Sequence, residues 1–198
     1  MDSSISKIAI QKKGRLNLPS RQFLASLGMD FPTNGKSLAV ACKNLPFSLI
    51  NIRDNDIPKF VSESLVDYGI VGLDVVLESR KKVKVIRKLD FCKCKMVIAV
   101  PKNSAIKSLK KLRGKRIATS YPNVLKDFLK RTGIKSKIIF VEGSVELAPY
   151  LQAADAVCDI TETGKTLKEC NLVPIKTILK SQAVLIQSPN NKNGLNFK

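Results

Sequence analysis

The segment Asp155-Ala-Val-Cys-Asp-Ile-Thr-Glu-Thr-Gly-Lys-Thr-Leu167 decides the fold. An apolar run ends in the acid Asp159, a loop of Thr, Glu and Gly follows, and a helical pattern begins after Gly164. This order is typical of a strand–loop–helix unit in an α/β protein. Such a loop directs backbone N–H groups and the helix dipole toward one point, which favours binding of a phosphate group. An ordinary strand-to-helix turn is the alternative interpretation.

The chemistry of this loop favours a sugar phosphate over a nucleoside triphosphate. Gly164-Lys165-Thr166 resembles the end of a P-loop, but that motif needs a glycine where the chain has Asp159, so we exclude a P-loop NTPase. An acid at a strand end is suited to accepting hydrogen bonds from ribose hydroxyls or to holding the waters of Mg²⁺. The candidate residues of this loop are Asp155, Asp159, Thr161, Glu162, Thr163, Gly164, Lys165 and Thr166.

The rest of the chain alternates short runs rich in Ile and Val with helical patterns. The predicted strands are residues 8–10, 38–42, 48–53, 68–71, 83–87, 95–100, 116–119, 137–141, 156–160 and 183–187. Predicted helices begin near Asp56, Tyr121 and Ser144, and a further one covers Leu18–Leu27 before Gly28. This alternation predicts an α/β fold with mixed, largely parallel sheets.

The number of strands predicts two lobes, because two sheets accommodate them more economically than one. We expect lobe I to comprise residues 1–91 and 172–198, with the strand Ala183–Gln187 crossing back to complete it. Lobe II is then residues 92–171 and carries the phosphate loop. The tail Ser188–Lys198 is rich in Asn, Lys and Gly and is expected to fray.

Four other polar turns follow predicted strands and are further candidates for ligand binding. They contribute Lys13, Gly14, Arg15, Gly72, Asp74, Tyr121 and Ser144. Each turn has a structural alternative: a solvated basic loop, a helix cap, a tyrosine covering the core, or a serine-capped helix. Together with the phosphate loop they favour a ligand-binding cleft between the lobes.

Composition excludes several functions. The 198 residues include 35 Lys and Arg, 16 Asp and Glu and no His, with a formal charge of +19. Without His there is no Ser–His–Asp triad, no His general base and no imidazole metal ligand. The 27 Lys and 8 Arg are scattered and aromatic residues are few, which disfavours a nucleic-acid-binding protein. Because the chain begins without an apolar export segment and has no membrane-length apolar run, we expect a cytoplasmic location and no membrane association.

The ordered segments resemble the ATP phosphoribosyltransferase family, whose members open histidine biosynthesis. The matching stretches are residues 8–16, 53–58, 67–72, 116–123, 143–149 and 155–167. The resemblance implies a two-lobed type II fold like that of periplasmic binding proteins, with a cleft between the sheets. It also implies that the enzyme joins N1 of the ATP adenine to C1 of phosphoribosyl pyrophosphate and releases pyrophosphate, with Mg²⁺ as cofactor.

The resemblance also assigns roles to residues. The loop from Asp155 to Thr166 corresponds to the phosphoribosyl pyrophosphate site, whereas Lys13, Gly14, Arg15, Gly72, Asp74, Tyr121 and Ser144 correspond to positions that serve ATP or pyrophosphate. Mg²⁺ is expected to arrive with the substrate, with Asp159 as a candidate protein ligand. No residue is assigned as an acid or base, because the adenine nitrogen is itself the nucleophile.

The resemblance leaves the mode of assembly open. A homo-oligomer of two or more copies is expected. The length matches the family's short form, which works with a regulatory subunit similar to histidyl-tRNA synthetase, whereas the motifs look more like the long form. A non-enzymatic two-lobed solute- or anion-binding module and an inactive remnant of the same enzyme are the alternative readings.

Overall fold

The computed structural model describes residues 5–32 and 37–191, and the chain divides into two compact units. Unit 1 comprises residues 1–92 and 182–198, and unit 2 comprises residues 93–181. The first boundary lies within one residue of the sequence-based one, but the second lies ten residues later than expected. Residues 172–181, expected in lobe I, form a strand of unit 2 because they pair along the strand that opens that unit.

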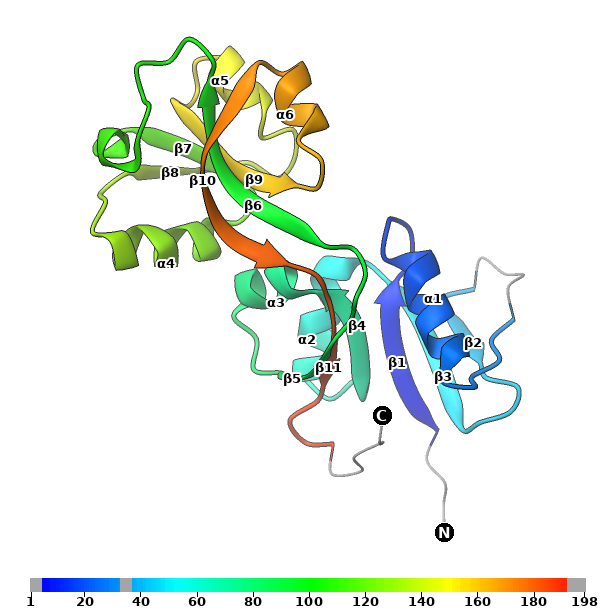
Figure 1. Ribbon diagram of the computed structural model, residues 1–198. Coiled ribbons are helices and arrows are strands. Elements are labelled where there is room, and N and C mark those ends of the chain that lie inside the picture. The colour runs from blue at the N-terminus through cyan, green and yellow to red at the C-terminus, as the bar shows by residue number, and fades with distance from the viewer. Residues whose placement is uncertain (1–4, 33–36, 192–198) are drawn as a thin grey trace. The chain divides into compact units, whose positions relative to one another are not determined.

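Unit 1 is built on a mixed sheet whose parallel centre is bordered by antiparallel strands (Figure 1). Its strands are β1 (Ser6–Gln11), β2 (Ala39–Ala41), β3 (Phe47–Ile52), β4 (Tyr68–Gly72), β5 (Lys84–Lys88) and β11 (Ala183–Gln187). Their order is β2-β3-β1-β4-β11-β5, and β3, β1 and β4 run parallel. The carboxyl ends of these three strands therefore meet at one edge of the sheet, where α/β proteins place their ligand sites.

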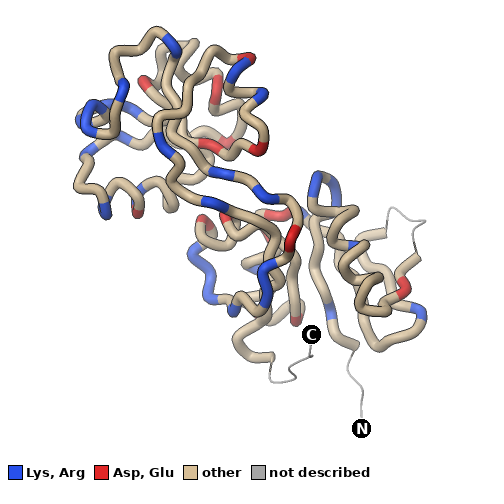
Figure 2. Tube along the Cα trace, viewed as in Figure 1, with Lys and Arg blue, Asp and Glu red and all other residues tan. Residues whose placement is uncertain are grey.

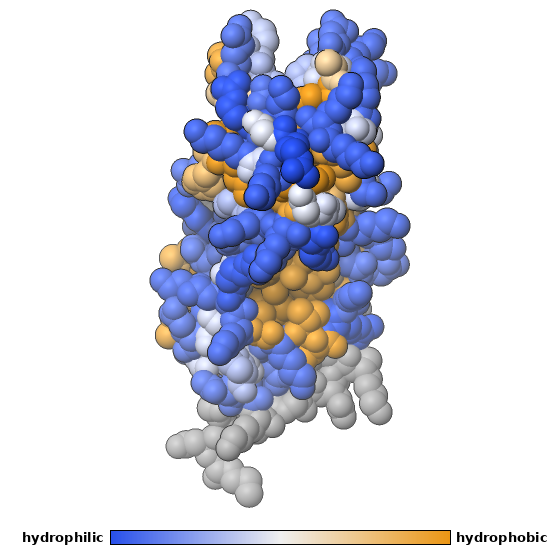
Figure 3. All heavy atoms as spheres, turned by 90° about the vertical axis from the view of Figure 1, so that its left-hand side faces the viewer, coloured by the Kyte–Doolittle hydropathy of each residue, from blue (hydrophilic) through white to orange (hydrophobic). Residues whose placement is uncertain are grey.

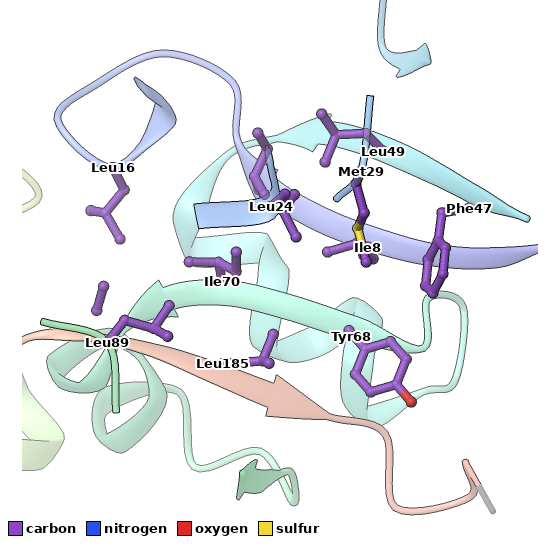
Figure 4. Packing of buried hydrophobic residues seen from close by; sticks show 12 residues of the cluster. Ile8, Leu16, Leu24, Met29, Phe47, Leu49, Tyr68, Ile70, Leu89 and Leu185 are labelled. Carbon is purple, nitrogen blue, oxygen red and sulfur yellow. The ribbon is translucent and has the colours of Figure 1, made fainter. Parts of the chain in front are cut away.

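Helices cover both faces of the unit 1 sheet. They are α1 (Asn17–Ser26), the 3-10 turn η1 (Asp54–Asp56), α2 (Ile57–Ser62) and α3 (Leu73–Ser79). Leu24 of α1 packs against Ile8, Ile70 and Leu185 of three neighbouring strands, and none of these side chains is accessible to solvent (Figure 4). The helices α2 and α3 bury Val61 and other aliphatic side chains on the opposite face. Burial on both faces explains why these strands are continuous apolar runs in the sequence.

Unit 2 has a second mixed sheet, and it carries the candidate phosphate loop. Its strands are β6 (Cys94–Pro101), β7 (Arg116–Thr119), β8 (Lys137–Phe140), β9 (Ala156–Thr161) and β10 (Leu172–Ser181), in the order β10-β6-β9-β7-β8. Its helices are η2 (Leu109–Leu112), α4 (Pro122–Thr132), α5 (Leu147–Tyr150) and α6 (Lys165–Glu169). Leu125 of α4 is buried against one face of the sheet, whereas Ala148 of α5 and Leu167 of α6 are buried against the other. As in unit 1, three neighbouring strands, here β9, β7 and β8, run parallel.

The α/β class and the mixed sheets are confirmed, and each predicted strand corresponds to an observed one. In both sheets more of the strand pairs are antiparallel than the sequence suggested. The strand β10 was not predicted, because its lysines, Pro174 and two register irregularities hide the period of a strand. The helix expected to start at Ser144 begins at Leu147, because Ser144 adopts a left-handed backbone conformation with φ of 50°.

The beginning of the tail is better ordered than expected. Ser188 is buried, its backbone N–H donates to the carbonyl of Asp67 at 2.9 Å, and its hydroxyl lies 2.8 Å from that of Ser64. These contacts hold the tail against unit 1 up to this point. Residues 192–198, which the same expectation covered, lie outside the described residues.

Basic residues are distributed along the whole of both units (Figure 2). In the space-filling view, hydrophilic residues occupy most of the visible face and surround smaller apolar areas (Figure 3). None of the helices in the described part of the chain combines the length and the apolar character needed to cross a membrane.

Candidate functional site

The loop that follows β9 is shaped by its own threonines and by Gly164. The Gly164 N–H donates to the Thr161 hydroxyl at 2.9 Å, and the Lys165 N–H donates to the Thr163 hydroxyl at 3.3 Å. Gly164 has φ of +81°, a left-handed conformation that glycine adopts without the strain a Cβ would bring. A Cβ at this position would meet no atom within 4 Å, so the space above the glycine is open. The loop is thus a preformed turn with open space above Gly164.

A cavity of about 590 Å³ lies within unit 2 beside this loop. The residues from Thr161 to Gly164 line one part of it, and residues of α6, β6 and β10, together with Lys102 and Asn171, line the rest. Three lysines, Lys95, Lys102 and Lys168, line the cavity as well. Its volume lies in the range of sites that bind small molecules. No local sequence pattern indicates these lysines, because they come from three separate segments and none belongs to a motif.

Asp159 lies on the same face of β9 as Thr161, since successive strand residues alternate between faces. Burial raises the pKa of the Asp159 carboxyl above its usual range, and the negative charge of Glu146 acts in the same direction. The Ile160 N–H, which donates to Asp159 Oδ1 at 2.7 Å, opposes that shift. A partly buried carboxylate of this kind gains from a hydroxyl donor or a cation, which fits the role that the sequence predicts for it.

The structure separates Asp155 from the loop. This residue precedes β9, so the six residues of the strand place it ~20 Å from the loop, at about 3.3 Å per residue. Its Oδ2 accepts a hydrogen bond from the Arg116 N–H at 2.8 Å, and the Arg116 guanidinium lies 3.4 Å from both carboxylate oxygens. The bond from the Arg116 backbone is the main reason that the pKa of Asp155 is lowered. Asp155 therefore joins the starts of β7 and β9, and the expectation that it belongs to the phosphate loop is corrected.

Tyr121 and Ser144 follow β7 and β8, so they lie at the same sheet edge as the loop after β9. Tyr121 immediately precedes α4, its N–H donates to the Thr119 hydroxyl at 2.9 Å, and its side chain packs against the core under α4. Ser144 is exposed and its carbonyl accepts from the Leu147 N–H. The structure brings both residues to this edge, although neither lines the 590 Å³ cavity.

In unit 1 the basic loop Lys13-Gly14-Arg15 follows β1 and is exposed. Gly14 has φ of +125°, where any side chain would strain the backbone, and a Cβ here would lie 2.7 Å from the Gln11 amide and displace it. Gln11 organises the turn, because its amide donates to Asp54 at 3.0 Å and its carbonyl oxygen accepts from the Leu16 N–H at 3.1 Å. The loop is therefore held in place while its basic side chains reach solvent.

Gly72 and Asp74 follow β4, which runs parallel to β1, so they lie at the same edge as the basic loop. Only 3% of Asp74 is exposed. A Cβ on Gly72 would lie 2.5 Å from Asp74 Oδ1, so the carboxylate occupies the space that this glycine leaves free. Its burial fits a role in shaping the turn, whereas the basic loop presents the accessible groups at this edge.

The carboxylates of unit 2 fit Mg²⁺ only if the substrate supplies the remaining ligands of the ion. Among the described residues, no cluster of three His, Cys, Asp or Glu side chains is arranged to hold a metal. Mg²⁺ commonly binds through one or two carboxylates together with substrate phosphates. Asp159, which has Glu146 close enough to affect its pKa, fits this mode.

Comparisons with known proteins point to one family. The model of the ATP phosphoribosyltransferase (HisG) family matches residues 53–196. The chain is 41% identical over 187 residues to an ATP phosphoribosyltransferase of Cytophaga hutchinsonii, covering 94% of the chain and 65% of that relative. It is also 33% identical to a chain of the ATP phosphoribosyl transferase (HisG:HisZ) complex from Thermotoga maritima, with a TM-score of 0.79, covering 93% of this chain and 88% of that one.

A more distant likeness concerns the fold alone. A probable amino-acid ABC transporter extracellular-binding protein of Bacillus subtilis has a TM-score of 0.58 at 15% identity, covering 94% of this chain and 85% of that one. This likeness confirms the two-lobed fold of the periplasmic-binding-protein type that the resemblance implied. The chain spans 65% of the length of the curated relative, so the relative contains sequence beyond the part compared.

Proposed function

Because the chain belongs to the ATP phosphoribosyltransferase family, we propose that it joins N1 of the ATP adenine to C1 of phosphoribosyl pyrophosphate and releases pyrophosphate. This is the first step of histidine biosynthesis. The observation that carries the proposal is the loop Thr161–Gly164 beside the 590 Å³ cavity, within the part of the chain that the family model matches. A cytoplasmic location belongs to the same proposal.

The loop is proposed to hold the 5′-phosphate of the sugar. The space above Gly164 is open, and α6 begins directly after it. The N–H groups of Gly164 and Lys165 donate to the Thr161 and Thr163 hydroxyls, so the loop is proposed to meet phosphate oxygens mainly through threonine hydroxyls. Thr163 and Thr166 are exposed and supply hydroxyl donors. Asp159 lies two residues before Thr161 on the same face of β9 and is proposed to accept hydrogen bonds from ribose hydroxyls.

Catalysis of this kind requires positioning and charge stabilisation, not a strong base. Displacement at the anomeric carbon develops positive charge on the sugar and negative charge on the departing pyrophosphate, and the adenine nitrogen carries its own electron pair. Lysines and backbone amides held in place can stabilise these charges. The absence of histidine is therefore compatible with the reaction.

Mg²⁺ is proposed to bind with the substrate, and Asp159 would hold it. When bound, the ion would supply charge neutralisation for the diphosphate group. The side chain of Asp159 would then bind both the cation and the sugar hydroxyls. This fits its environment, because burial disfavours the charged carboxylate and a cation or a hydroxyl donor stabilises it.

Partner subunits are a further part of the proposal. The solved complex from Thermotoga maritima contains HisG together with HisZ, and this chain covers 88% of the matched chain. We therefore propose that the protein works as a homo-oligomer with a HisZ-like regulatory subunit. The basic loop at Lys13 and Arg15 in unit 1 is proposed to serve ATP or pyrophosphate. No membrane or nucleic acid partner is proposed.

The test is pyrophosphate release by the full chain, measured alone and after addition of a HisZ-like subunit. We expect release only when ATP, phosphoribosyl pyrophosphate and Mg²⁺ are all present, and formation of phosphoribosyl-ATP in equal amount. Omission of each component in turn is the control. Absence of release under every condition, with tight binding of an amino acid or oxyanion, would instead favour a solute-binding module.

A further inference from the structure

A row of polar side chains crosses three neighbouring strands of unit 2. The register pairs Lys95 of β6 with Thr161 of β9 on one side and with Lys180 of β10 on the other. Residues directly opposite each other on antiparallel strands project from the same face of the sheet. Lys180, Lys95 and Thr161 therefore form one row. Figure 2 shows basic segments on both β6 and β10, which run side by side.

This row faces the side of the sheet that carries α6 and the cavity. Val97, two residues after Lys95, packs with Leu167 of α6 on that face. Lys95, Val97 and Thr161 all line the 590 Å³ cavity. Thr161 is also the residue whose hydroxyl fixes the position of Gly164. Lys95 therefore lies next to the loop to which we assign the sugar phosphate.

Two lysines in directly opposite positions are unfavourable unless an anion joins them. Like charges at such positions destabilise a sheet. Within the described part of the chain, no carboxylate forms an ion pair with Lys95 or Lys180. Glu162 is the single acid among the residues that line the cavity, against Lys95, Lys102 and Lys168. The cavity thus has a surplus of positive charge next to a phosphate loop.

Edge protection does not explain Lys95. Lysines on an edge strand discourage pairing with other chains, and this reason suffices for Lys180, because β10 is at the edge of the sheet. β6, however, is paired on both sides, with β10 and with β9. A lysine on this inner strand is exposed because the cavity opens above it.

We propose that Lys95, supported by Lys180, binds a phosphate-type dianion of the substrate held at the loop Thr161–Gly164. This inference rests on the proposed function and adds a residue that positions the substrate. The anion is either the 5′-phosphate or the diphosphate of phosphoribosyl pyrophosphate, which share the same chemistry. Lys95 contributes an ammonium donor from the strand next to the loop, and the loop itself contributes threonine hydroxyls.

The experiment measures binding of ribose 5-phosphate and of inorganic pyrophosphate with Mg²⁺ to the full chain by calorimetry. Lys95→Met should weaken binding of one probe about tenfold or more, since a charge-assisted hydrogen bond is lost. The affected probe identifies which group Lys95 holds. Lys180→Met should weaken the same probe less. Lys137→Met is the matched control, because it removes the same charge from β8, at the other edge of the sheet, and should leave both affinities unchanged.

A second measurement separates binding from a merely structural role. Without anion, Lys95→Met should raise the melting temperature, because the repulsion with Lys180 is relieved, and added anion should then stabilise it less than the parent chain. Lys95→Arg should retain the affinity. The inference is overturned if Lys95→Met binds both probes as tightly as the parent chain while the parent chain makes phosphoribosyl-ATP. If the parent chain binds neither probe and makes no product, the proposed function fails together with it.

Discussion

Replacement of Asp155 by alanine separates structural from ligand-binding roles at the two ends of β9. The carboxylate accepts the Arg116 N–H at 2.8 Å, a charge-assisted bond whose loss costs about 1.5–3 kcal/mol. The ion pair with the guanidinium adds less than about 1 kcal/mol, because 42% of the Arg116 side chain and 30% of the Asp155 side chain are exposed. We therefore expect Asp155→Ala to lower the free energy of unfolding mainly through the lost backbone bond.

Thermal and urea unfolding measure this effect. For a chain of this length, each kcal/mol corresponds to about 2–4 °C in melting temperature, so we expect a decrease of roughly 3–12 °C at pH 7. Asp155→Asn is the control, because its amide oxygen still accepts the Arg116 N–H while the charge is lost, and its effect should be smaller.

The pH dependence follows from the lowered pKa of Asp155, which the Arg116 backbone N–H causes. Since the folded pKa lies below the unfolded value of 3.8, the contribution is fully present above that value and is lost as the pH falls through the folded pKa. The difference between the parent chain and Asp155→Ala should therefore shrink in acid. A difference that stays constant down to the lowest pH at which the chain remains folded would contradict this origin.

The same variant also tests the placement of the phosphate site. Because Asp155 lies at the far end of β9, Asp155→Ala should leave the affinity for ribose 5-phosphate within about twofold of the parent value. A large loss of affinity in a variant that remains folded would refute our separation of Asp155 from the loop.

Three further variants address the loop itself. Gly164→Ala should lower the free energy of unfolding by about 1 kcal/mol, because alanine is strained in the left-handed backbone conformation. The added methyl group would also cover the loop, so calorimetry should show weaker phosphate binding. An unchanged affinity would argue against close approach of the phosphate to Gly164. Thr161→Val removes the acceptor of the Gly164 N–H and should lower the free energy of unfolding by about 1 kcal/mol. It should also raise the KM for phosphoribosyl pyrophosphate in steady-state assays. An unaltered KM would show that this hydrogen bond does not shape the site. Asp159→Asn should reduce turnover in the pyrophosphate-release assay. It should not destabilise the chain, because it removes a partly buried charge. Full turnover would exclude the role proposed for Asp159.

The sequence predicted the parts of the fold that local patterns determine. Arg116–Thr119 is observed with the predicted bounds, because its apolar centre, Ile117 and Ala118, is buried and polar turns flank the strand. α4 begins at Pro122 and ends before Gly133, as proline in the first turn and a left-handed glycine after the last turn predict. These signals depend on a few neighbouring residues, so they predict the element whatever its tertiary contacts, as long as it is buried.

The missed features depend on pairing between distant segments. β10 exists because it pairs with β6, seventy and more residues earlier, and its own sequence, which contains Pro174, Lys176 and Lys180, carries no clear strand signal. Asp155 was placed with the loop because it is near Asp159 in sequence, although an extended strand carries it away. Lys95 could not be predicted as a ligand-binding residue, because only the strand register places it opposite Thr161.

The most direct test of the phosphate loop is a titration of the ¹⁵N-labelled chain with phosphoribosyl pyrophosphate and Mg²⁺, followed by backbone amide signals in NMR spectra. We predict that the largest shifts occur at residues 161–166 and are absent when the titration is repeated with ribose, which lacks the phosphate. Saturable binding with unmoved signals at residues 161–166 would contradict the assignment of this loop as the phosphate site.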